Sequence, residues 1–190
     1  MQWSADLAKR LYESNWKPDI IVGLYRGGVF PAIVIQDYLR SKGIKSLHFP
    51  LVCSSYDEDA AVSSPRECIV KLQEPDKADI ISLFKAVKRP LNVLAVDDIY
   101  DTGKTMHAVK KTFDHFALES DDGTSLSASD GILSFNFRTA CICWKPNKCS
   151  LASPTWWIRE VEDDVWTVFP HEFTGLTEEE LENKAEAEED

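Results

Sequence analysis

The sequence lacks long apolar runs, and it lacks paired cysteines. No apolar stretch approaches the roughly 20 residues that a membrane-spanning helix needs. The first ten residues, MQWSADLAKR, lack the apolar core of a signal peptide. The five cysteines form no C-x-x-C pair, which disfavours a zinc–thiolate site and a disulfide framework. We therefore expect a cytoplasmic protein with reduced thiols and no membrane contact.

Positive charge is also scarce, with 21 Lys and Arg against 32 Asp and Glu and a net charge of −11. Residues 177–190 hold eight acids and one lysine, so this tail carries −7 and residues 1–176 carry only −4. Nucleic-acid binding needs clustered basic residues, and this chain offers none. Composition predicts one domain over residues 1–176, followed by an acidic, disordered or loosely helical tail.

The sequence does have enough apolar material for one core, at 44% of 190 residues. Residues 54–66 are polar and rich in turn formers, which predicts a mobile loop. Elsewhere the apolar spacing predicts helices that alternate with strands, and this alternation predicts an α/β fold with a mainly parallel sheet. The predicted helices are residues 4–15, 29–41, 76–88 and 106–118, and the predicted strands are 19–25, 46–53, 92–96 and 132–144, with a weaker candidate at 68–72.

The most specific segment is NVLAVDDIYDTGKT, residues 92–105. A buried strand delivers the adjacent acids Asp97 and Asp98 at its carboxyl end, and a D-T-G-K-T turn then opens a helix. Open α/β sheets bind ligands at this end of their strands, and a helix N-terminus presents N–H groups to anions. The two acids would bind hydroxyl groups or a hydrated cation, and the turn would bind a phosphate. A sugar phosphate carries both hydroxyl groups and a phosphate, so this pair of sites suits such a ligand. The residues expected to bind the phosphate are Thr102, Gly103, Lys104 and Thr105.

Two other interpretations of this segment fit its residues less well. Gly103-Lys104-Thr105 fits the end of a nucleotide-binding P-loop, but the first glycine of that motif would fall at Asp98. A carboxylate there would repel a triphosphate, so a nucleoside triphosphatase is disfavoured. An acidic surface turn without a ligand has no need of three acids beside a tight turn, so this alternative is also weak.

The decapeptide VDDIYDTGKT resembles the 5-phosphoribosyl diphosphate (PRPP) signature of type I phosphoribosyltransferases. The order of motifs from about residue 18 to 172 resembles the 6-oxopurine branch, most closely the xanthine-guanine enzymes. The resemblance implies a Rossmann-like core at about 18–144 and a small C-terminal hood at about 145–175. It also implies transfer of 5-phosphoribosyl from PRPP to N9 of xanthine, guanine or hypoxanthine, with release of diphosphate, in purine salvage. The family's enzymes use Mg²⁺ and usually form homodimers or homotetramers.

The resemblance assigns roles to the PRPP-binding residues of this chain. Asp97 and Asp98 match the acids that contact the ribose and Mg²⁺. The loop that receives the diphosphate, which in the family often contains a non-proline cis peptide, matches Tyr25, Arg26, Gly27 and Gly28. The lid over the site matches Ser54, Ser55 and Tyr56, although the region up to residue 89 is longer here than in the family pattern.

The resemblance also places the base. Asp101 matches the acid that faces N7 of the purine and manages its proton. Lys145 matches the lysine that binds the 6-oxo group, and Trp166 matches the aromatic residue that stacks on the ring. Backbone carbonyls at Trp166 and Thr167 would accept from the group at position 2.

Two alternatives stay open at this point. One is a regulator that keeps the fold and senses PRPP or a nucleotide without turnover. The other is a phosphoribosyltransferase for another base, such as adenine or a pyrimidine. Lys145 separates this second alternative from a 6-oxopurine enzyme, because an ammonium donor suits an oxo group and opposes an amino group.

Overall fold

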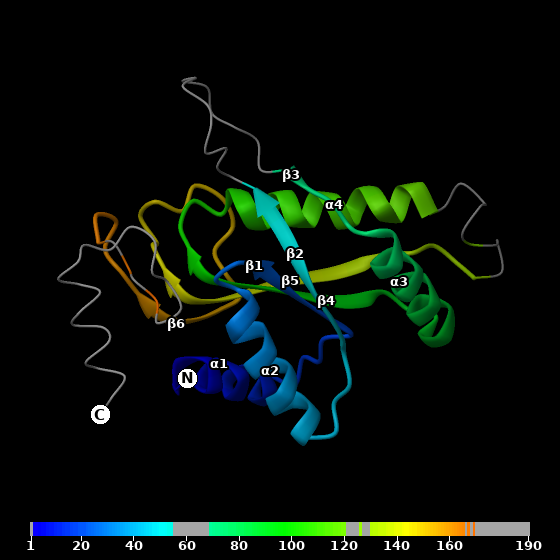
Figure 1. Ribbon diagram of the computed structural model, residues 1–190, viewed down its shortest axis with the longest axis horizontal. Helices are drawn as coiled ribbons and strands as arrows, with labels where there is room; N and C mark the ends of the chain where they lie inside the picture. The colour runs from blue at the N-terminus through cyan, green and yellow to red at the C-terminus, as the bar shows by residue number, and fades with distance from the viewer. Residues whose placement is uncertain are drawn as a thin grey trace.

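The computed structural model describes residues 2–54, 69–120, 126, 130–165, 167 and 169. In these ranges helices and strands alternate along most of the chain (Figure 1). The helices are α1 (Gln2–Glu13), α2 (Val29–Ser41), α3 (Glu74–Val87) and α4 (Lys104–Ser120). The strands are β1 (Ile20–Tyr25), β2 (Leu47–Ser54), β3 (Ile69–Val70), β4 (Leu91–Tyr100), β5 (Phe135–Trp144) and β6 (Trp156–Glu160).

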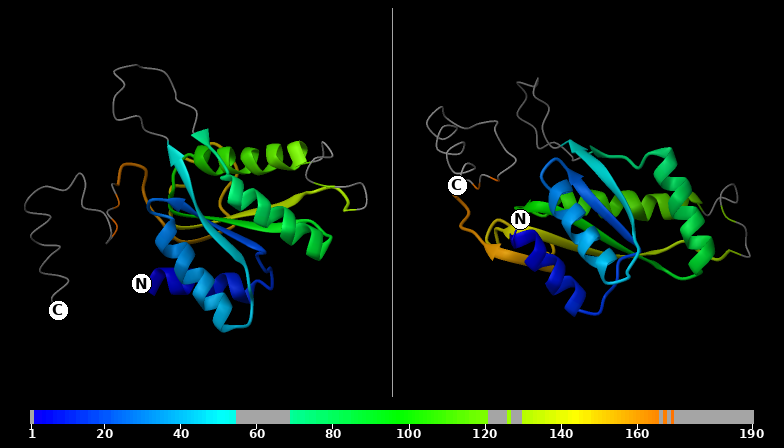
Figure 2. Two further views of the ribbon diagram at one scale, coloured as in Figure 1. Left: turned by 45° about the vertical axis from the view of Figure 1, so that its right-hand side comes forward. Right: turned by 60° about the horizontal axis from the view of Figure 1, so that its bottom comes forward.

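The strands form one sheet in the order β3-β2-β1-β4-β5-β6. Neighbouring strands from β2 to β6 are parallel, and only the two-residue β3 at the edge runs antiparallel to its neighbour β2. Helices α1 and α2 cover one face of the sheet, and α3 and α4 cover the other (Figures 1 and 2). The predicted α/β fold with a mainly parallel sheet is therefore confirmed.

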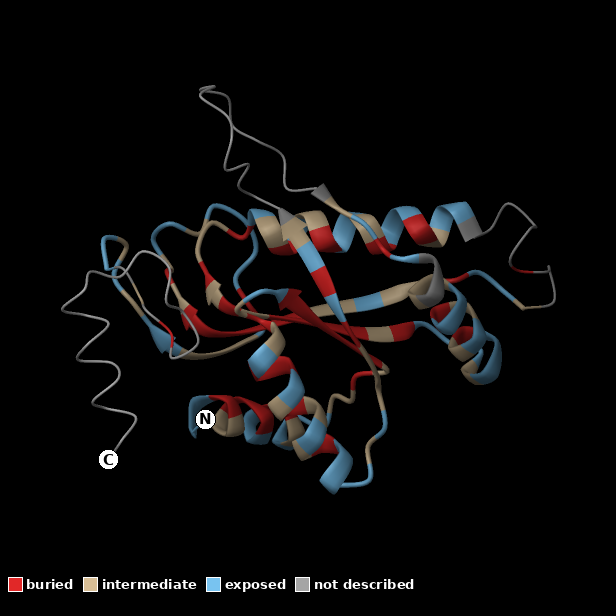
Figure 3. Cartoon of the chain, in the orientation of Figure 1, coloured by how far each residue is buried: buried red, intermediate tan, exposed pale blue. Residues whose placement is uncertain are grey.

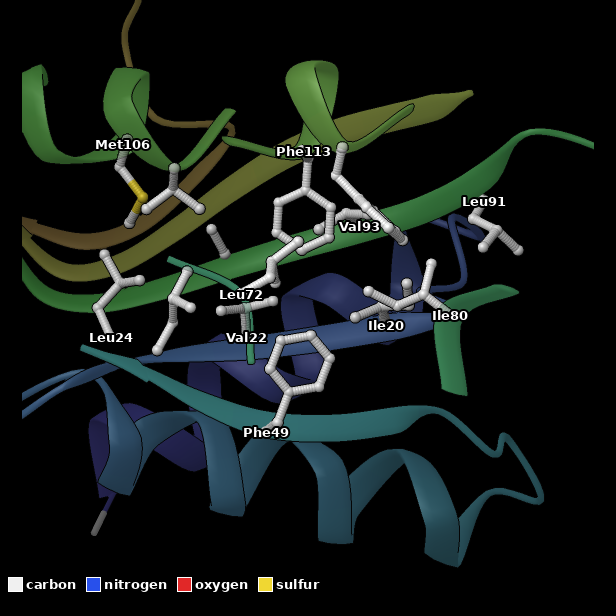
Figure 4. Packing of buried hydrophobic residues seen from close by; sticks show 14 of the residues in the cluster. Ile20, Val22, Leu24, Phe49, Leu72, Ile80, Leu91, Val93, Met106 and Phe113 are labelled. Carbon is white, nitrogen blue, oxygen red and sulfur yellow. The ribbon is translucent and has the colours of Figure 1, made fainter. Parts of the chain in front are cut away.

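The central strands are buried on both faces, which explains their nearly continuous apolar sequences (Figure 3). Successive side chains of a strand point to opposite faces. In β1, Ile20, Val22 and Leu24 pack toward α3 and α4, where Met106 and Phe113 complete the core (Figure 4). On the other face of the same strand, Ile21 joins the core formed with α1 and α2.

Helix α2 has the predicted bounds but buries a different stripe. The helical spacing of apolar residues in the 29–41 segment puts Phe30 and Ile33 on one stripe, yet they are 44% and 49% exposed. The buried residues are instead Pro31, Ala32, Ile35 and Leu39. Almost every residue of the segment VFPAIVI is apolar, so periodicity could not decide which side faces β1. A Cβ on Gly23 of β1 would lie 2.9 Å from the Cβ of Ala32, so the helix packs where the strand has no side chain.

Several element boundaries also differ from the expectations. The first helix was predicted to begin at residue 4, but α1 begins at Gln2 and buries Ser4 within it. β4 continues through both acids to Tyr100, beyond the predicted end at residue 96. α4 then begins at Lys104, two residues before the predicted start. The adjacent acids therefore belong to the strand, which holds them more firmly than a turn would.

The strand β6 was not predicted, and it lies within residues 145–175, where a C-terminal hood was expected. The segment WWIRE is short and shows no clear alternation of apolar and polar residues. It pairs with β5, and Arg138 of β5 lies over the rings of Trp16 and Trp156, at 5.0 and 5.5 Å from their centroids. Contacts between distant segments thus form β6, and local sequence cannot show them.

None of the helices in the described ranges is both long and apolar enough to cross a bilayer. The acidic tail at residues 177–190 lies outside the described ranges.

Candidate active site

The order of the strands fixes where a ligand can bind. β1 lies between β2 and β4 in the sheet. The strands β2 and β3 lie on one side of β1, and the later strands β4, β5 and β6 lie on the other side. In an open α/β sheet, a crevice forms where the order reverses, beyond the carboxyl ends of the strands. Here those ends belong to β1 and β4, which lead into the R-G-G loop and the D-T-G-K-T turn. The fold thus brings together the two motifs that are about 75 residues apart in the sequence.

The loop after β1 packs directly against β4. A Cβ on Gly27 would overlap the carboxylate of Asp98, and a Cβ on Gly28 would overlap the carbonyl oxygen of Val96. Gly28 is also confined by the Cα of Asp97, at 2.8 Å from the same hypothetical Cβ. Only glycine therefore permits this approach. The peptide bond between Tyr25 and Arg26 is cis, and both of these residues are exposed at the end of β1.

Asp97 and Asp98 lie side by side at the end of β4. Asp98 is only 8% exposed, and its Oδ1 accepts a hydrogen bond from the Ile99 amide at 2.7 Å. Asp97 Oδ1 accepts from the Asp98 amide at 3.0 Å. Burial, and then the neighbouring Asp98 carboxylate, raise the pKa of Asp97 well above its usual range. A cation or a hydroxyl donor at this edge of the sheet would relieve that unfavourable electrostatic environment.

The D-T-G-K-T turn joins β4 to α4. Gly103 has a φ of +81°, a conformation that favours glycine, and a Cβ there would lie 3.1–3.3 Å from Tyr100 and Leu151. The hydroxyl oxygen of Thr102 accepts from the Lys104 amide at 3.4 Å. α4 begins at Lys104, so the free N–H groups of its first turn lie beside the end of β4. The turn therefore offers a site for an anion.

Asp101 stands between the acids and this turn. Its Oδ2 lies 3.8 Å from the Lys148 ammonium. Its Oδ1 is shielded from solvent and has no hydrogen-bond partner among the described residues. One oxygen of the carboxyl group therefore lies near a cation, while the other is covered and lacks a donor among the described residues.

The loop between β5 and β6 covers the turn after β4. The Lys145 amide donates to the Tyr100 carbonyl at 2.9 Å, and the Tyr100 hydroxyl donates to the Ala152 carbonyl at 2.6 Å. The Ser150 amide donates to the Thr102 carbonyl at 3.4 Å. Burial, with smaller contributions from nearby cysteines, raises the pKa of Tyr100 to about 12, so its hydroxyl stays a donor.

The Lys145 side chain is 5% exposed and points into the segment that follows β6. Its ammonium donates to the carbonyls of Asp163 and Val165, at 3.1 and 2.8 Å. A lysine has three donors, so one remains without an acceptor among the described residues. Thr167 lies just beyond, and its buried hydroxyl likewise has no partner in this part of the chain.

The structure therefore brings together most of the residues that the sequence singled out. Ser54 is the last residue of β2, which neighbours β1, while Ser55, Tyr56 and Trp166 lie outside the described ranges. Sequence reasoning missed Tyr100, Lys148 and the 149–152 segment. The polar hydroxyl of Tyr100 in an otherwise buried strand was the one available signal, because a buried hydroxyl needs a partner.

The comparisons with known proteins agree with this geometry. Residues 2–146 match the phosphoribosyl transferase domain family. This chain belongs to that family. It is 24% identical over 181 residues to a hypoxanthine-guanine phosphoribosyltransferase of Saccharomyces cerevisiae, covering 85% of this chain and 78% of that protein. It is 30% identical over 105 residues to xanthine phosphoribosyltransferase 1 of the same yeast, covering 53% of this chain and 50% of that protein.

Solved structures of phosphoribosyltransferases also share the fold. A purine phosphoribosyltransferase from Pyrococcus horikoshii superimposes with a TM-score of 0.60 and 21% identity. The superposition covers 93% of this chain and 91% of that one. The expected type I phosphoribosyltransferase core is therefore confirmed.

Proposed function

We propose that this phosphoribosyl transferase domain transfers the 5-phosphoribosyl group of PRPP to N9 of a 6-oxopurine and releases diphosphate, as in purine salvage. The observation that carries the proposal is the packing of the Gly27-Gly28 loop against Asp98, beside the anion-binding turn at the start of α4. One crevice thus offers places for a diphosphate, a ribose and a phosphate. The names of the yeast relatives support a 6-oxopurine as acceptor.

The PRPP half of the site is proposed as follows. The 5′-phosphate binds the N–H groups and side chains of Thr102, Gly103, Lys104 and Thr105. Asp97 and Asp98 accept hydrogen bonds from the ribose hydroxyls. The leaving diphosphate lies along Tyr25, Arg26, Gly27 and Gly28, where the missing side chains let the backbone approach an anion. Ser54, Ser55 and Tyr56 begin the lid that excludes water from the reacting C1′ centre.

In the base half, Asp101 accepts a hydrogen bond from N7 and takes or shares the proton as N9 attacks C1′. The third N–H of Lys145 donates to the 6-oxo group, while its other two donors hold the carbonyls of Asp163 and Val165. Trp166 stacks on the ring, and carbonyls at Trp166 and Thr167 read position 2. Lys145 would therefore contact the base and hold the C-terminal hood segment at the same time.

The donor set also fits Mg²⁺. Asp97 and Asp98 present adjacent carboxylate oxygens, the ligand type that this hard cation takes, and the raised pKa of Asp97 reflects negative charge that a cation would compensate. When bound, the ion would neutralise the diphosphate as it leaves. Asp97 and Asp98 would contact the ion directly or through water, and PRPP oxygens would supply its other ligands.

Assembly and location remain proposals drawn from the sequence and the family. We propose a homodimer or homotetramer, which sedimentation analysis would test. A cytoplasmic location stays a prediction from the sequence. The relatives named as transferases favour turnover over a role as a PRPP-sensing regulator.

The test is a steady-state assay with PRPP, Mg²⁺ and a panel of purines. We expect turnover of at least one of hypoxanthine, guanine and xanthine, with kcat/KM for adenine lower by ~100-fold or more. A 6-amino donor facing the Lys145 ammonium would leave buried donors unpaired, which polar sites reject strongly. Turnover of adenine equal to that of guanine would contradict the assignment of the base, and no turnover with any purine would favour a binding role.

The Lys145→Ala variant tests the donor at the 6-oxo group. We expect KM for 6-oxopurines to rise and the ratio of kcat/KM between guanine and adenine to fall by ~10-fold or more. The substitution also frees two carbonyls of the hood, but that structural effect would lower the activity on both bases together. An unchanged ratio would therefore contradict the assigned role of Lys145.

A further inference from the structure

We propose that Tyr100 is a positioning residue for the 5′-phosphate, because its ring and its hydroxyl hold the D-T-G-K-T turn in place without contacting PRPP. The inference rests on the proposed function, since it assumes that this turn binds the 5′-phosphate of PRPP. Tyr100 lies inside the most specific motif of the sequence, but the resemblance assigned it no role.

Tyr100 lies on the face of β4 that strict alternation would not give it. Leu91 and Val93 of this strand pack toward α3 and α4, so alternation would turn Tyr100 toward α1 and α2. Tyr100 instead packs in the same core as Leu91 and Val93, and it is only 5% exposed. The alternation shifts at Asp97 and Asp98, whose side-chain oxygens accept hydrogen bonds from the next amides along the strand. The ring of Tyr100 therefore lies on the face covered by α4, the helix that follows the turn.

The ring of Tyr100 packs against the glycine of the turn. A Cβ on Gly103 would lie 3.1 Å from Cε1 and 3.2 Å from the hydroxyl oxygen of Tyr100, and 3.3 Å from the Cβ of Leu151. Tyr100 and Leu151 thus enclose the Cα of Gly103. The carbonyl of Gly103 accepts a hydrogen bond from the His107 amide at 3.0 Å, which links the orientation of this glycine to the first turn of α4.

The hydroxyl of Tyr100 fixes the segment that carries Leu151. It donates to the carbonyl of Ala152, the next residue along the chain, at 2.6 Å. The Ser150 amide, on the other side of Leu151, donates to the Thr102 carbonyl at 3.4 Å. The short segment is therefore bound to Tyr100 at one end and to the turn at the other, and the hydroxyl keeps Leu151 against the glycine.

This arrangement matters because a glycine turn is intrinsically free to change its conformation. Ordering a glycine costs more backbone entropy than ordering any other residue. An anion site made of backbone N–H groups binds well only while those groups point to one place. If the turn were loose, the phosphate would have to order it on binding, and the affinity would fall accordingly. Tyr100 orders the turn before PRPP arrives.

The competing role for Tyr100 is general support of the core. Loss of such support would lower the stability of the protein and weaken all of its ligands together. A loosened turn would weaken only ligands that carry the 5′-phosphate. Direct contact between Tyr100 and PRPP is disfavoured, because the side chain is buried and its hydroxyl already donates to Ala152.

The test replaces Tyr100 by Phe, which keeps the ring and removes only the hydroxyl. We expect calorimetry to show a Kd for PRPP–Mg²⁺ that rises ~5-fold or more, with kcat at saturating PRPP within twofold. The matched control is Ser46→Ala. The Ser46 hydroxyl donates to the Pro18 carbonyl at 2.7 Å and also joins two distant segments, but Ser46 precedes β2, at the end of the sheet opposite the site. This control should bind PRPP like the wild type.

A pair of ligands separates the turn from the core. Guanosine 5′-monophosphate and guanosine differ only in the 5′-phosphate, and both are tested as inhibitors. Tyr100→Phe should raise the inhibition constant of the nucleotide ~5-fold and leave that of the nucleoside within twofold. Leu151→Ala should show the same pattern, because it removes the side chain that packs on Gly103 with Tyr100. Leu151 is 44% exposed, so this variant supplies the comparison if thermal melting shows that Tyr100→Phe does not fold.

Three results would overturn the inference. They are a PRPP affinity of Tyr100→Phe equal to that of Ser46→Ala, an equal weakening of nucleotide and nucleoside, and a folded Leu151→Ala variant with wild-type PRPP affinity. A wild-type protein that bound PRPP but turned over no 6-oxopurine would contradict the proposed function instead, and the PRPP affinities of the variants would still decide the role of Tyr100.

Discussion

At the scale of single residues, the site places two adjacent carboxyl groups at the end of β4, where water has little access to solvate their charge. Asp97 and Asp98 lie near the end of a strand that is buried on both faces, and burial and their proximity raise the pKa of Asp97 well above its usual range. The folded state therefore keeps a proton on this pair over a pH range in which the unfolded chain has released it. Such an arrangement costs stability and indicates that the acids serve binding.

The sign of this effect gives a prediction for Asp97→Asn. Below the ordinary pKa of 3.8 both states of the chain are protonated, so Asp97 costs nothing there. As the pH rises above this value, only the unfolded chain ionises readily, and the folded state is progressively disfavoured. Asp97→Asn should therefore raise the free energy of unfolding at pH 7, and the gain should disappear at about pH 3, below that ordinary pKa.

Urea unfolding at both pH values measures this difference. A variant that is less stable than the wild type at pH 7, or a gain that is independent of pH, would contradict the electrostatic account of Asp97. The same variant should bind PRPP–Mg²⁺ more weakly in calorimetry, because the amide lacks the charge that the ribose and cation are proposed to use.

The residues that could be predicted from the sequence are those whose chemistry is local. The D-T-G-K-T turn depends on the conformation of Gly103 and a nearby helix start, so its pattern was sufficient to predict the turn, although α4 begins two residues before the predicted start. Tyr100 and Lys148 depend on contacts across 52 and 47 residues of chain, and no local pattern indicates such pairs. The base site at Trp166 remains a prediction.

At the scale of elements, the loop after β1 and the end of β4 form a single unit because two glycines let them touch. Strand propensity and glycine turns predicted each part, but only the sheet order places them together. The same dependence on packing explains the errors in the helices and strands. α2 is apolar on most sides, so its buried stripe is set by β1, and β6 exists because β5 and α1 provide its partners.

The contact between these elements predicts the effect of Gly27→Ala. The new methyl group would overlap the carboxylate of Asp98, so the loop or the acid must move. We expect a destabilisation of about 1–3 kcal/mol from overpacking and a loss of PRPP affinity of ~10-fold or more. Calorimetry with PRPP–Mg²⁺ and urea unfolding provide the two measurements.

Gly43→Ala is the matched control for this substitution. Gly43 follows α2 with a φ of +79° and no atoms within 4 Å of an added Cβ, so alanine there costs about 1–2 kcal/mol through backbone strain alone. Its PRPP affinity should equal that of the wild type. If Gly27→Ala lost no more affinity than Gly43→Ala, the proposed diphosphate loop would be in the wrong place.

At the scale of the whole molecule, the charge is divided between a nearly neutral body and an acidic end. Residues 177–190 contain one large apolar residue, Leu181, among eight acids. Such a segment has little apolar surface to bury, and its charges repel one another. Deleting it should therefore leave kcat within twofold and the melting temperature within about 3 °C. A fall of many degrees in differential scanning calorimetry, or a change in oligomeric state, would show that the tail packs on the body or joins subunits.

The most direct test of the central claim measures product formation by Asp101→Asn. The amide keeps the shape of the side chain but cannot take the N7 proton, and proton transfer of this kind contributes ~10²–10⁴-fold. We predict that kcat for nucleotide formation from PRPP and guanine or hypoxanthine falls at least ~100-fold, while PRPP affinity stays within a few-fold. Asp114→Asn, at an exposed aspartate of α4 that also pairs with a lysine, should keep wild-type kcat. If Asp101→Asn formed nucleotide at nearly the wild-type rate, the assignment of this crevice as the site of transfer to a purine would be wrong.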